Sequence, residues 1–338
     1  MALQPSRNCL AWGVLTLALA GCAPEEAQRP VRPSDTGTSA STSTTSSTST
    51  ATGTPTGTET TPAWDCSALA SPPLTRTDLA GLYAAEDFAF DDQGHLITVY
   101  QSTMFQQEYP PGDSTPFAPL DGSAGGPASL RMLQDGDIVY ANVDTATLYR
   151  VTFSGTSTPI HSGLSYPMGI DIHIDGFVYL SDLAGLLRID PNTGDTEVLT
   201  SPTLFNFPNG LTFSADYRTL YFGTSDSIMA LPMDEAGYPE GPPTLFAAAT
   251  DFGDFLGMAV DACDNVYAIW DGDKLLRWTA DGQGPEMLLE LDQDAWMSNL
   301  QFGSGVGGWQ ADHLYVTDRS ISNPGYYELN VGVGDKPR

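Results

Sequence analysis

Six short segments of the chain repeat, and the type of residue that opens each one decides what chemistry they could share. The opening residues are Glu86, Ala128, Met168, Asn209, Leu256 and Ser298. The intervals between them are 42, 40, 41, 47 and 42 residues, a period characteristic of propeller blades, whose equivalent positions all face one central channel. Glu86, Asn209 and Ser298 carry oxygen atoms that can bind a divalent cation, whereas the other three side chains offer none. The spacing therefore predicts a ring around the axis, and the residue types predict that three of its six positions can bind a cation.

The elements that must position this ring are short strands. Each opening residue is followed by a strand, a turn and a second strand rich in aromatic and β-branched residues, as in Asp175–Leu180 and Asn265–Trp270. Period-two patterning broken by turns, without a long 3.6-period stretch, indicates an all-β chain. Six such repeats over about 270 residues predict a six-bladed β-propeller. We expect closure by a strand near Leu74–Leu82 that pairs with Tyr326–Leu329.

Three of the repeats resemble blades of the SMP-30/gluconolactonase-like family, and the resemblance extends over residues 65–338. The matching motifs are Pro208–Asp216 with Thr219–Phe222 for the fourth blade, Gly257–Ala262 with Asn265–Tyr267 for the fifth, and Glu86 with Phe88 and Phe90 for the first. The resemblance implies a six-bladed propeller. It also implies, as in many members, hydrolysis of lactones or esters with a divalent cation, often calcium, on the axis.

The resemblance assigns roles to four ring positions. Glu86 matches the first-blade cation ligand and Asn209 the fourth-blade ligand. The third-blade ligand position holds Met168, and the fifth-blade position, where the family has an Asp that also acts as base or nucleophile, holds Leu256. Calcium takes six to eight oxygen ligands, and a thioether and an isobutyl group supply none. The resemblance therefore implies a partly lost metal site.

Other oxygens near the ring could compensate. A weaker site for calcium or another divalent cation could use Glu86, Asn209, Ser298 and Asn299 with water. Asp254 precedes Leu256 by two residues, points the same way in an extended strand and is a weak candidate for the catalytic carboxylate. Asp87 and Asp171 are expected at opposite-facing or deeper positions. The alternative is a polar channel without metal.

Two classes of function compete for this ring. One is a cation-dependent lactonase or esterase, and the other is a non-catalytic propeller that binds a small molecule, a glycan or an envelope protein at the same face. The aromatic residues expected at the channel mouth are Tyr166, Phe205, Phe207, Phe252, Phe255 and Trp296, although interblade packing explains some of them equally well. Because the fifth-blade carboxylate is missing, the sequence favours binding.

Charge narrows the range of partners. The chain has 13 Lys and Arg against 42 Asp and Glu, a formal net charge of −29. That field repels nucleic acid, so nucleic-acid binding is not expected. The four His residues show no metal-ligand spacing, and His173 and His313 are expected to be hydrogen-bonded blade residues. We expect a monomer.

The first 63 residues predict export and anchoring. Residues 1–21 read as a signal peptide ending in Leu19-Ala-Gly-Cys22, which resembles a bacterial lipobox with Cys22 as the acylated residue. The alternative is an ordinary secretory signal with a chance Cys. Ala23 follows Cys22, and the absence of Asp there favours the outer membrane. Residues 22–63, rich in Ser and Thr, are predicted to be a disordered tether, and residues 64–338 the propeller.

Two cysteines remain after export and acylation, Cys66 and Cys263. An even pair in an oxidising compartment favours a disulfide. It would join the segment that starts at Trp64 to the hairpin of the fifth repeat. The alternative is a pair of buried thiols.

Overall fold

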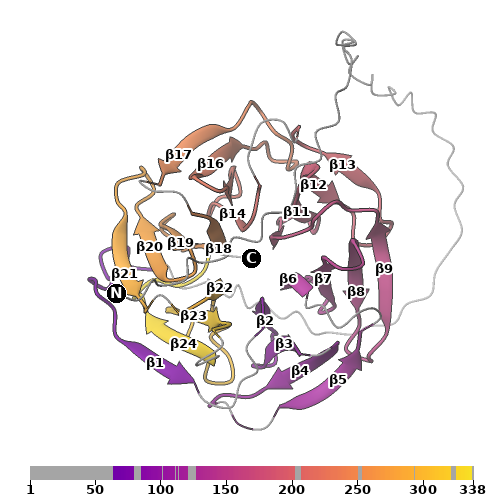
Figure 1. Cartoon of the computed structure of the whole chain (residues 1–338), viewed down its shortest axis with the longest axis horizontal. Coiled ribbons are helices and arrows are strands. Elements are labelled where there is room, and N and C mark those ends of the chain that lie inside the picture. The colour runs from indigo at the N-terminus through magenta and orange to yellow at the C-terminus, as the bar shows by residue number, and fades with distance from the viewer. Residues whose placement is uncertain are drawn as a thin grey trace, which may run out of the picture. The chain divides into compact units, whose positions relative to one another are not determined.

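The computed structural model describes most of the chain after residue 63, and these residues form six four-stranded antiparallel sheets around a common axis (Figure 1). The described residues are 64–79, 85–100, 102–110, 112, 114–120, 127–201, 207–249, 253–292, 294–320 and 325–336. The predicted signal peptide, Cys22 and the tether lie outside them. Within the described ranges, no helix is long and apolar enough to cross a membrane. The predicted six-bladed β-propeller is confirmed.

Blades one to five each consist of four consecutive strands, ordered from the axis outward (Figure 1). Blade one has β2 (Phe88–Phe90), β3 (Leu96–Tyr100), β4 (Thr103–Gln107) and β5 (Thr115–Pro119), and blade two has β6 (Pro127–Met132), β7 (Ile138–Asn142), β8 (Thr147–Val151) and β9 (Ser157–Ser162). Blade three has β10 (Ile170–Ile172), β11 (Val178–Asp182), β12 (Gly185–Ile189) and β13 (Thr196–Val198). Blade four has β14 (Leu211–Phe213), β15 (Thr219–Gly223), β16 (Ser227–Pro232) and β17 (Thr244–Ala248), and blade five has β18 (Phe255–Val260), β19 (Val266–Trp270), β20 (Lys274–Trp278) and β21 (Glu286–Glu290).

Blade six closes the ring with strands from both ends of the described chain. It contains β22 (Met297–Phe302), β23 (His313–Asp318), β24 (Gly325–Asn330) and, outermost, β1 (Arg76–Leu79). Arg76 pairs with Leu329 and Leu79 with Tyr326. The predicted closing partners are therefore confirmed, and the outer strand occupies the middle of the range expected for it.

The core is divided among the blade interfaces. In the described residues, six hydrophobic clusters each join the facing sheets of two neighbouring blades. Because blades cover both faces of the middle strands, β7, β11 and β19 are buried along their whole length. Outer strands such as β13 and β17 remain partly exposed. Burial on both faces explains the near-continuous apolar runs in the second strand of each repeat.

The disulfide between Cys66 and Cys263 is present, as predicted, with their Cα atoms 5.7 Å apart. It joins the segment before β1 to the turn between β18 and β19 in blade five. The two half-cystines are 197 residues apart in the sequence. The link therefore ties the N-terminal end of the described chain to a blade other than the one that β1 completes.

Candidate functional site

The six ring positions lie next to one another around the axis. The hydroxyl of Ser298 donates to the carbonyl oxygen of Glu86 at 2.8 Å, which joins blade six to blade one. The hydroxyl of Ser181 in β11 donates to the carbonyl oxygen of Asn209 at 2.5 Å, which joins blade three to blade four. Ala128 is in β6, and its side chain lies outside the described residues.

Glycines follow the ring position in blades three, four and five and allow the blades to approach closely. A Cβ atom on Gly169 would lie 2.5 Å from the carbonyl oxygen of Asn209. A Cβ on Gly210 would lie 1.9 Å from the carbonyl oxygen of Leu256, and one on Gly257 would lie 2.5 Å from Asn299. The ring is therefore narrow, and its backbone leaves no room for side chains at these three positions.

Glu86 forms an ion pair with Arg319, which follows β23 in blade six. The Glu86 side chain is 24% exposed and that of Arg319 45%. Burial lowers the pKa of the Arg319 guanidinium, and the backbone N–H of Arg319 donates to the carbonyl oxygen of Trp296 at 2.8 Å. Arg319 carries no signal in the sequence, because it lies in a loop without a motif and 233 residues after Glu86.

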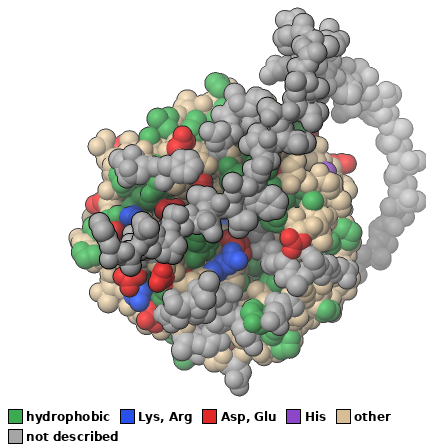
Figure 2. All heavy atoms as spheres, viewed as in Figure 1, with side chains coloured by type: hydrophobic (Ala, Val, Ile, Leu, Met, Phe, Trp, Pro, Cys, Tyr) green, Lys and Arg blue, Asp and Glu red, His purple; other side chains and the backbone are tan. Residues whose placement is uncertain are grey.

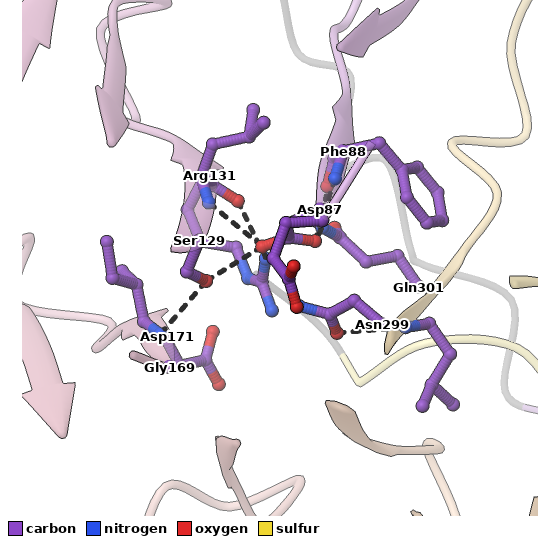
Figure 3. Close-up of polar contacts among 12 residues, drawn as sticks. Asp87, Phe88, Ser129, Arg131, Gly169, Asp171, Asn299 and Gln301 are labelled. Carbon is purple, nitrogen blue, oxygen red and sulfur yellow. Dashed lines mark hydrogen bonds and ion pairs between the residues drawn. The ribbon is translucent and has the colours of Figure 1, made fainter. Parts of the chain in front are cut away.

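One residue beyond the ring, Asp87 is the centre of a buried polar network (Figure 3). Its Oδ2 atom accepts hydrogen bonds from the Ser129 hydroxyl at 2.7 Å and the Leu130 N–H at 2.8 Å. The same oxygen pairs with Nη1 of Arg131 at 2.6 Å, and the Oδ1 atom accepts the N–H of Phe88 at 2.8 Å. The Oδ2 atom of this carboxylate therefore links blade one to blade two.

Residues of β22 complete this layer from blade six. The side-chain amide of Gln301 donates to Oδ1 of Asp87 at 3.3 Å and to the carbonyl oxygen of Phe88. Oδ1 of Asn299 accepts the N–H of Leu300 at 2.8 Å. The register of β22 shifts between Met297 and Asn299, and such a bulge redirects neighbouring side chains. The side-chain oxygen of Asn299 is therefore used within its own strand.

A second buried ion pair lies on the axis beyond the network around Asp87. Nζ of Lys336 lies 2.7 Å from Oδ2 of Asp171 in β10. Asp171, for which the sequence predicts an opposite-facing or deeper position, lies three residues beyond the ring position Met168. Lys336 carries no signal in the sequence either, because it follows the last repeat and belongs to no motif.

The ring residues, in this arrangement, do not fit a calcium ion. The carboxylate of Glu86 is neutralised by Arg319, and the hydroxyl of Ser298 donates to backbone carbonyl oxygens. Asn209 is buried, with 7% of the residue exposed. Among the residues that the structure describes, no three His, Cys, Asp or Glu side chains are placed to hold a metal ion together. A calcium site would need several oxygens, and those of Glu86, Ser298 and Asn299 already have other partners.

Tyr166, Phe207 and Trp296 each precede a ring position by two residues. Tyr166 packs against Phe207 with their ring centroids 5.5 Å apart, and Trp296 is 51% exposed. The buried carboxylates of Asp182 and Asp318 accept the N–H groups of Tyr166 and Trp296, both at 2.9 Å. These two bonds fix the loops that carry the aromatic rings.

The remaining predicted aromatic residues divide into two groups. Phe255 is buried and packs against Trp270 with their centroids 4.6 Å apart, so it belongs to the interblade core. Phe205 and Phe252 lie outside the described residues.

Figure 2 shows basic side-chain atoms beside acidic ones near the centre of the viewed face.

Asp254 and the histidines have local contacts. The carbonyl oxygen of Asp254 accepts the N–H of Asp271 at 3.0 Å, and the residue is partly buried next to the ring strand β18. Each histidine has a side-chain partner within its blade or the next one: Asp91 for His95, Thr196 for His161, Asp175 for His173 and Glu328 for His313. The four histidines are therefore hydrogen-bonded residues of the blades, as expected for His173 and His313.

Comparison with known proteins gives one family match. Residues 178–320 match the model of the SMP-30/Gluconolactonase/LRE-like region. A search of curated protein sequences finds no significant match.

Solved structures with the same fold are numerous. The calcium-binding protein regucalcin from Agrobacterium tumefaciens has 18% identity and a TM-score of 0.64, over 78% of this chain and 96% of its own. A gluconolactonase from Xanthomonas campestris has 18% identity and a TM-score of 0.62, over 78% of this chain and 92% of its own. Virginiamycin B lyase from Staphylococcus aureus has 17% identity and a TM-score of 0.52, over 75% of this chain and 87% of its own. At these identities the likeness concerns the fold. The chain is therefore a six-bladed β-propeller that contains an SMP-30/gluconolactonase/LRE-like region.

Proposed function

We propose that this propeller is a binding module that recognises its ligand at the ring face. The observation that carries the proposal is the ion pair between Glu86 and Arg319. Glu86 is the one carboxylate at the six ring positions, and Leu256 stands where the family resemblance implies a second. A hydrolase of this kind needs a carboxylate that activates water or attacks the carbonyl carbon, and the loss of a general base costs roughly 10²–10⁴-fold in rate.

The surroundings of the ring suit recognition of a small molecule, a glycan or an envelope protein. Tyr166, Phe207 and Trp296 offer aromatic surface near the channel mouth, and the first and last of these are exposed. The side-chain amide of Asn209 can both donate and accept hydrogen bonds. A few directed polar groups beside apolar surface are typical of ligand sites.

The second candidate is a divalent-cation-dependent lactonase or esterase. The observation that favours it is the match of residues 178–320 to the SMP-30/Gluconolactonase/LRE-like model. In that reading Glu86, Asn209, Ser298 and Asn299 would hold calcium or another divalent cation, and Asp254 would supply the carboxylate. This requires Arg319 to leave Glu86.

Calcium titration separates the two candidates. We expect the wild-type protein to show no micromolar calcium affinity in calorimetry and to leave lactones and aryl esters intact. The Met168→Asn, Leu256→Asp double variant restores two oxygen ligands, and Arg319→Met added to it frees the Glu86 carboxylate. Since calcium affinity follows ligand number and charge, each step should tighten binding, the whole series by at least roughly tenfold.

An Arg218→Met variant is the control for loss of a guanidinium, because Arg218 pairs with the exposed Glu235 away from the axis. It should leave calcium binding unchanged. Tight calcium binding and lactone hydrolysis by the wild-type protein, both abolished in Glu86→Gln, would show that the chain is a hydrolase and reject the binding proposal.

We further propose that the module is a cell-envelope lipoprotein, held at the outer membrane through acylated Cys22 and spaced from it by residues 22–63. The lipobox-like Leu19–Cys22 and the Ser/Thr-rich composition of the tether support this proposal. Several acyl chains, each methylene worth about 0.8 kcal/mol, would give firm anchoring.

A Cys22→Ala variant tests the anchor. We expect its precursor to remain unprocessed, and the wild-type precursor to accumulate when lipoprotein signal peptidase is inhibited, because that peptidase acts only after Cys22 is acylated. Immunoblotting of membrane and soluble fractions measures both effects. Normal cleavage and release of Cys22→Ala would contradict the lipoprotein proposal.

A further inference from the structure

The chain contains two lysines, Lys274 and Lys336, and one of them lies buried on the propeller axis. Lys336 is 3% exposed. Its Nζ atom donates to Oδ2 of Asp171 at 2.7 Å, to the hydroxyl of Thr212 at 2.9 Å and to the carbonyl oxygen of Phe213 at 3.0 Å. These three oxygens match the three N–H donors of an ammonium group.

The three oxygens come from two neighbouring blades and lie deeper than the ring. Asp171 and Thr212 are each three residues beyond the ring positions of blades three and four. At about 3.3 Å per residue, the ammonium lies roughly 10 Å further along the channel. The cavity around it is narrow and is also lined by Arg131, Gln301 and Asp335. The side chain of Lys336 therefore enters from the end of the channel opposite to the ring.

The segment that carries Lys336 is held in place from both sides. The carbonyl oxygen of Val331 accepts the N–H of Ala70 at 3.0 Å, and that of Gly334 accepts the N–H of Ala262 at 2.9 Å. Asp335 forms a β-bridge with Asp261 at the end of blade five. The disulfide joins Cys66, near Ala70, to Cys263, next to Ala262. The disulfide therefore links the segment around Ala70 to the segment 261–263, and both segments contact residues 331–335.

We propose that the end of the axis opposite to the ring is an ammonium-binding site whose resident ligand is the chain's own Lys336, and that the site accepts an external primary alkylammonium when this side chain is removed. The site consists of Asp171, Thr212 and the carbonyl of Phe213. A buried carboxylate is costly unless a cation and hydrogen bonds compensate it.

Amine acetylation with an N-hydroxysuccinimide ester tests the occupancy in the full-length protein. Lys274 is the internal control, since it pairs with Asp273 at the surface and its side chain is 26% exposed. Because Lys336 must leave its site before it can react, its acetylation, followed by mass spectrometry, should be at least roughly tenfold slower than that of Lys274. The two lysines should react alike in denaturant. Equal rates in the native protein would overturn the proposal.

The Cys66→Ser, Cys263→Ser double variant tests the grip on this segment. Without the disulfide, we expect Lys336 to be acetylated faster than in the wild-type protein while the rate at Lys274 stays constant. An unchanged rate at Lys336 would refute the role of the disulfide in retaining the ammonium.

Chemical rescue tests the nature of the ligand. Lys336→Ala should lower the melting temperature by roughly 5–10 °C, because Asp171 loses its buried counter-charge. Millimolar n-butylammonium should restore part of this loss in Lys336→Ala, and tetramethylammonium, which has no N–H donor, should not. Lys274→Ala is the matched control and should respond to neither cation. No loss of stability in Lys336→Ala, or equal effects of the two cations, would show that no ammonium site exists. Should Lys336→Ala fail to fold, the acetylation rates in the wild-type protein still decide.

Discussion

Gly210→Ala is expected to lower the free energy of unfolding by at least about 3 kcal/mol, the upper part of the range for overpacked cores. The added Cβ would lie 1.9 Å from the carbonyl oxygen of Leu256 and 3.2 Å from Cα of Gly257. Both neighbours are backbone atoms of the next blade, so no side-chain rotation can relieve the contact. Blades four and five would have to separate near the axis. Thermal or urea unfolding followed by circular dichroism measures the loss.

Gly241→Ala is the matched control in the same blade. Its new Cβ would meet only Cγ of Pro232, at 3.8 Å, which is ordinary van der Waals contact. We expect this variant to be as stable as the wild-type protein. If Gly210→Ala unfolds at the same temperature as Gly241→Ala, the close approach of the blades at the ring is wrong.

Arg131→Met is expected to cost about 3–5 kcal/mol of unfolding free energy, the usual loss when one partner of a buried ion pair is removed. Asp87 is fully buried, and its Oδ2 atom lies 2.6 Å from Nη1 of Arg131. Methionine keeps most of the volume but leaves the carboxylate without a counter-charge. Chemical denaturation curves measure the effect, and the Asp87→Asn, Arg131→Met double variant should lose less than the two single variants together.

Arg150→Met is the control for this experiment. Arg150 pairs with Asp135 and Asp137 in a partly exposed setting, with its own side chain 21% exposed. Surface pairs contribute about 0–1 kcal/mol, so a small loss is expected. Similar losses in Arg131→Met and Arg150→Met would mean that the pair on the axis is no more important than one at the surface.

Three carboxylates at or along the propeller axis are paired with basic side chains of the same chain. Arg319 pairs with Glu86 at the ring, Arg131 with Asp87 one layer deeper, and Lys336 with Asp171 beyond it. Three of only 13 basic residues are thus placed on the axis of a chain with a net charge of −29. Each of them neutralises a carboxylate that would otherwise attract an external cation, and this supports the proposal of a binding module over a metal-dependent hydrolase.

The sequence alone determined the architecture. The intervals between ring residues and the alternation of apolar residues within each repeat were sufficient to predict six blades. The strand pair Arg76–Leu329 agrees with the closure that the two ends of the repeat array predicted, and the disulfide Cys66–Cys263 agrees with the pairing predicted for the two cysteines of residues 64–338. These features are readable because each blade is local in sequence, with its hydrophobic pattern set by the strands that it must bury.

Only the tertiary structure decided what the polar residues on the axis do. Ser298 and Asn299 carry the right oxygens for a cation, but one bonds a backbone carbonyl and the other a backbone N–H at a bulge in β22. Arg319 and Lys336 are 233 and 165 residues from the carboxylates that they neutralise, and neither belongs to a repeated motif. The types and spacing of the residues show which side chains are available for binding or catalysis. Which groups meet depends on ring closure, because closure brings together segments that local sequence patterns do not relate.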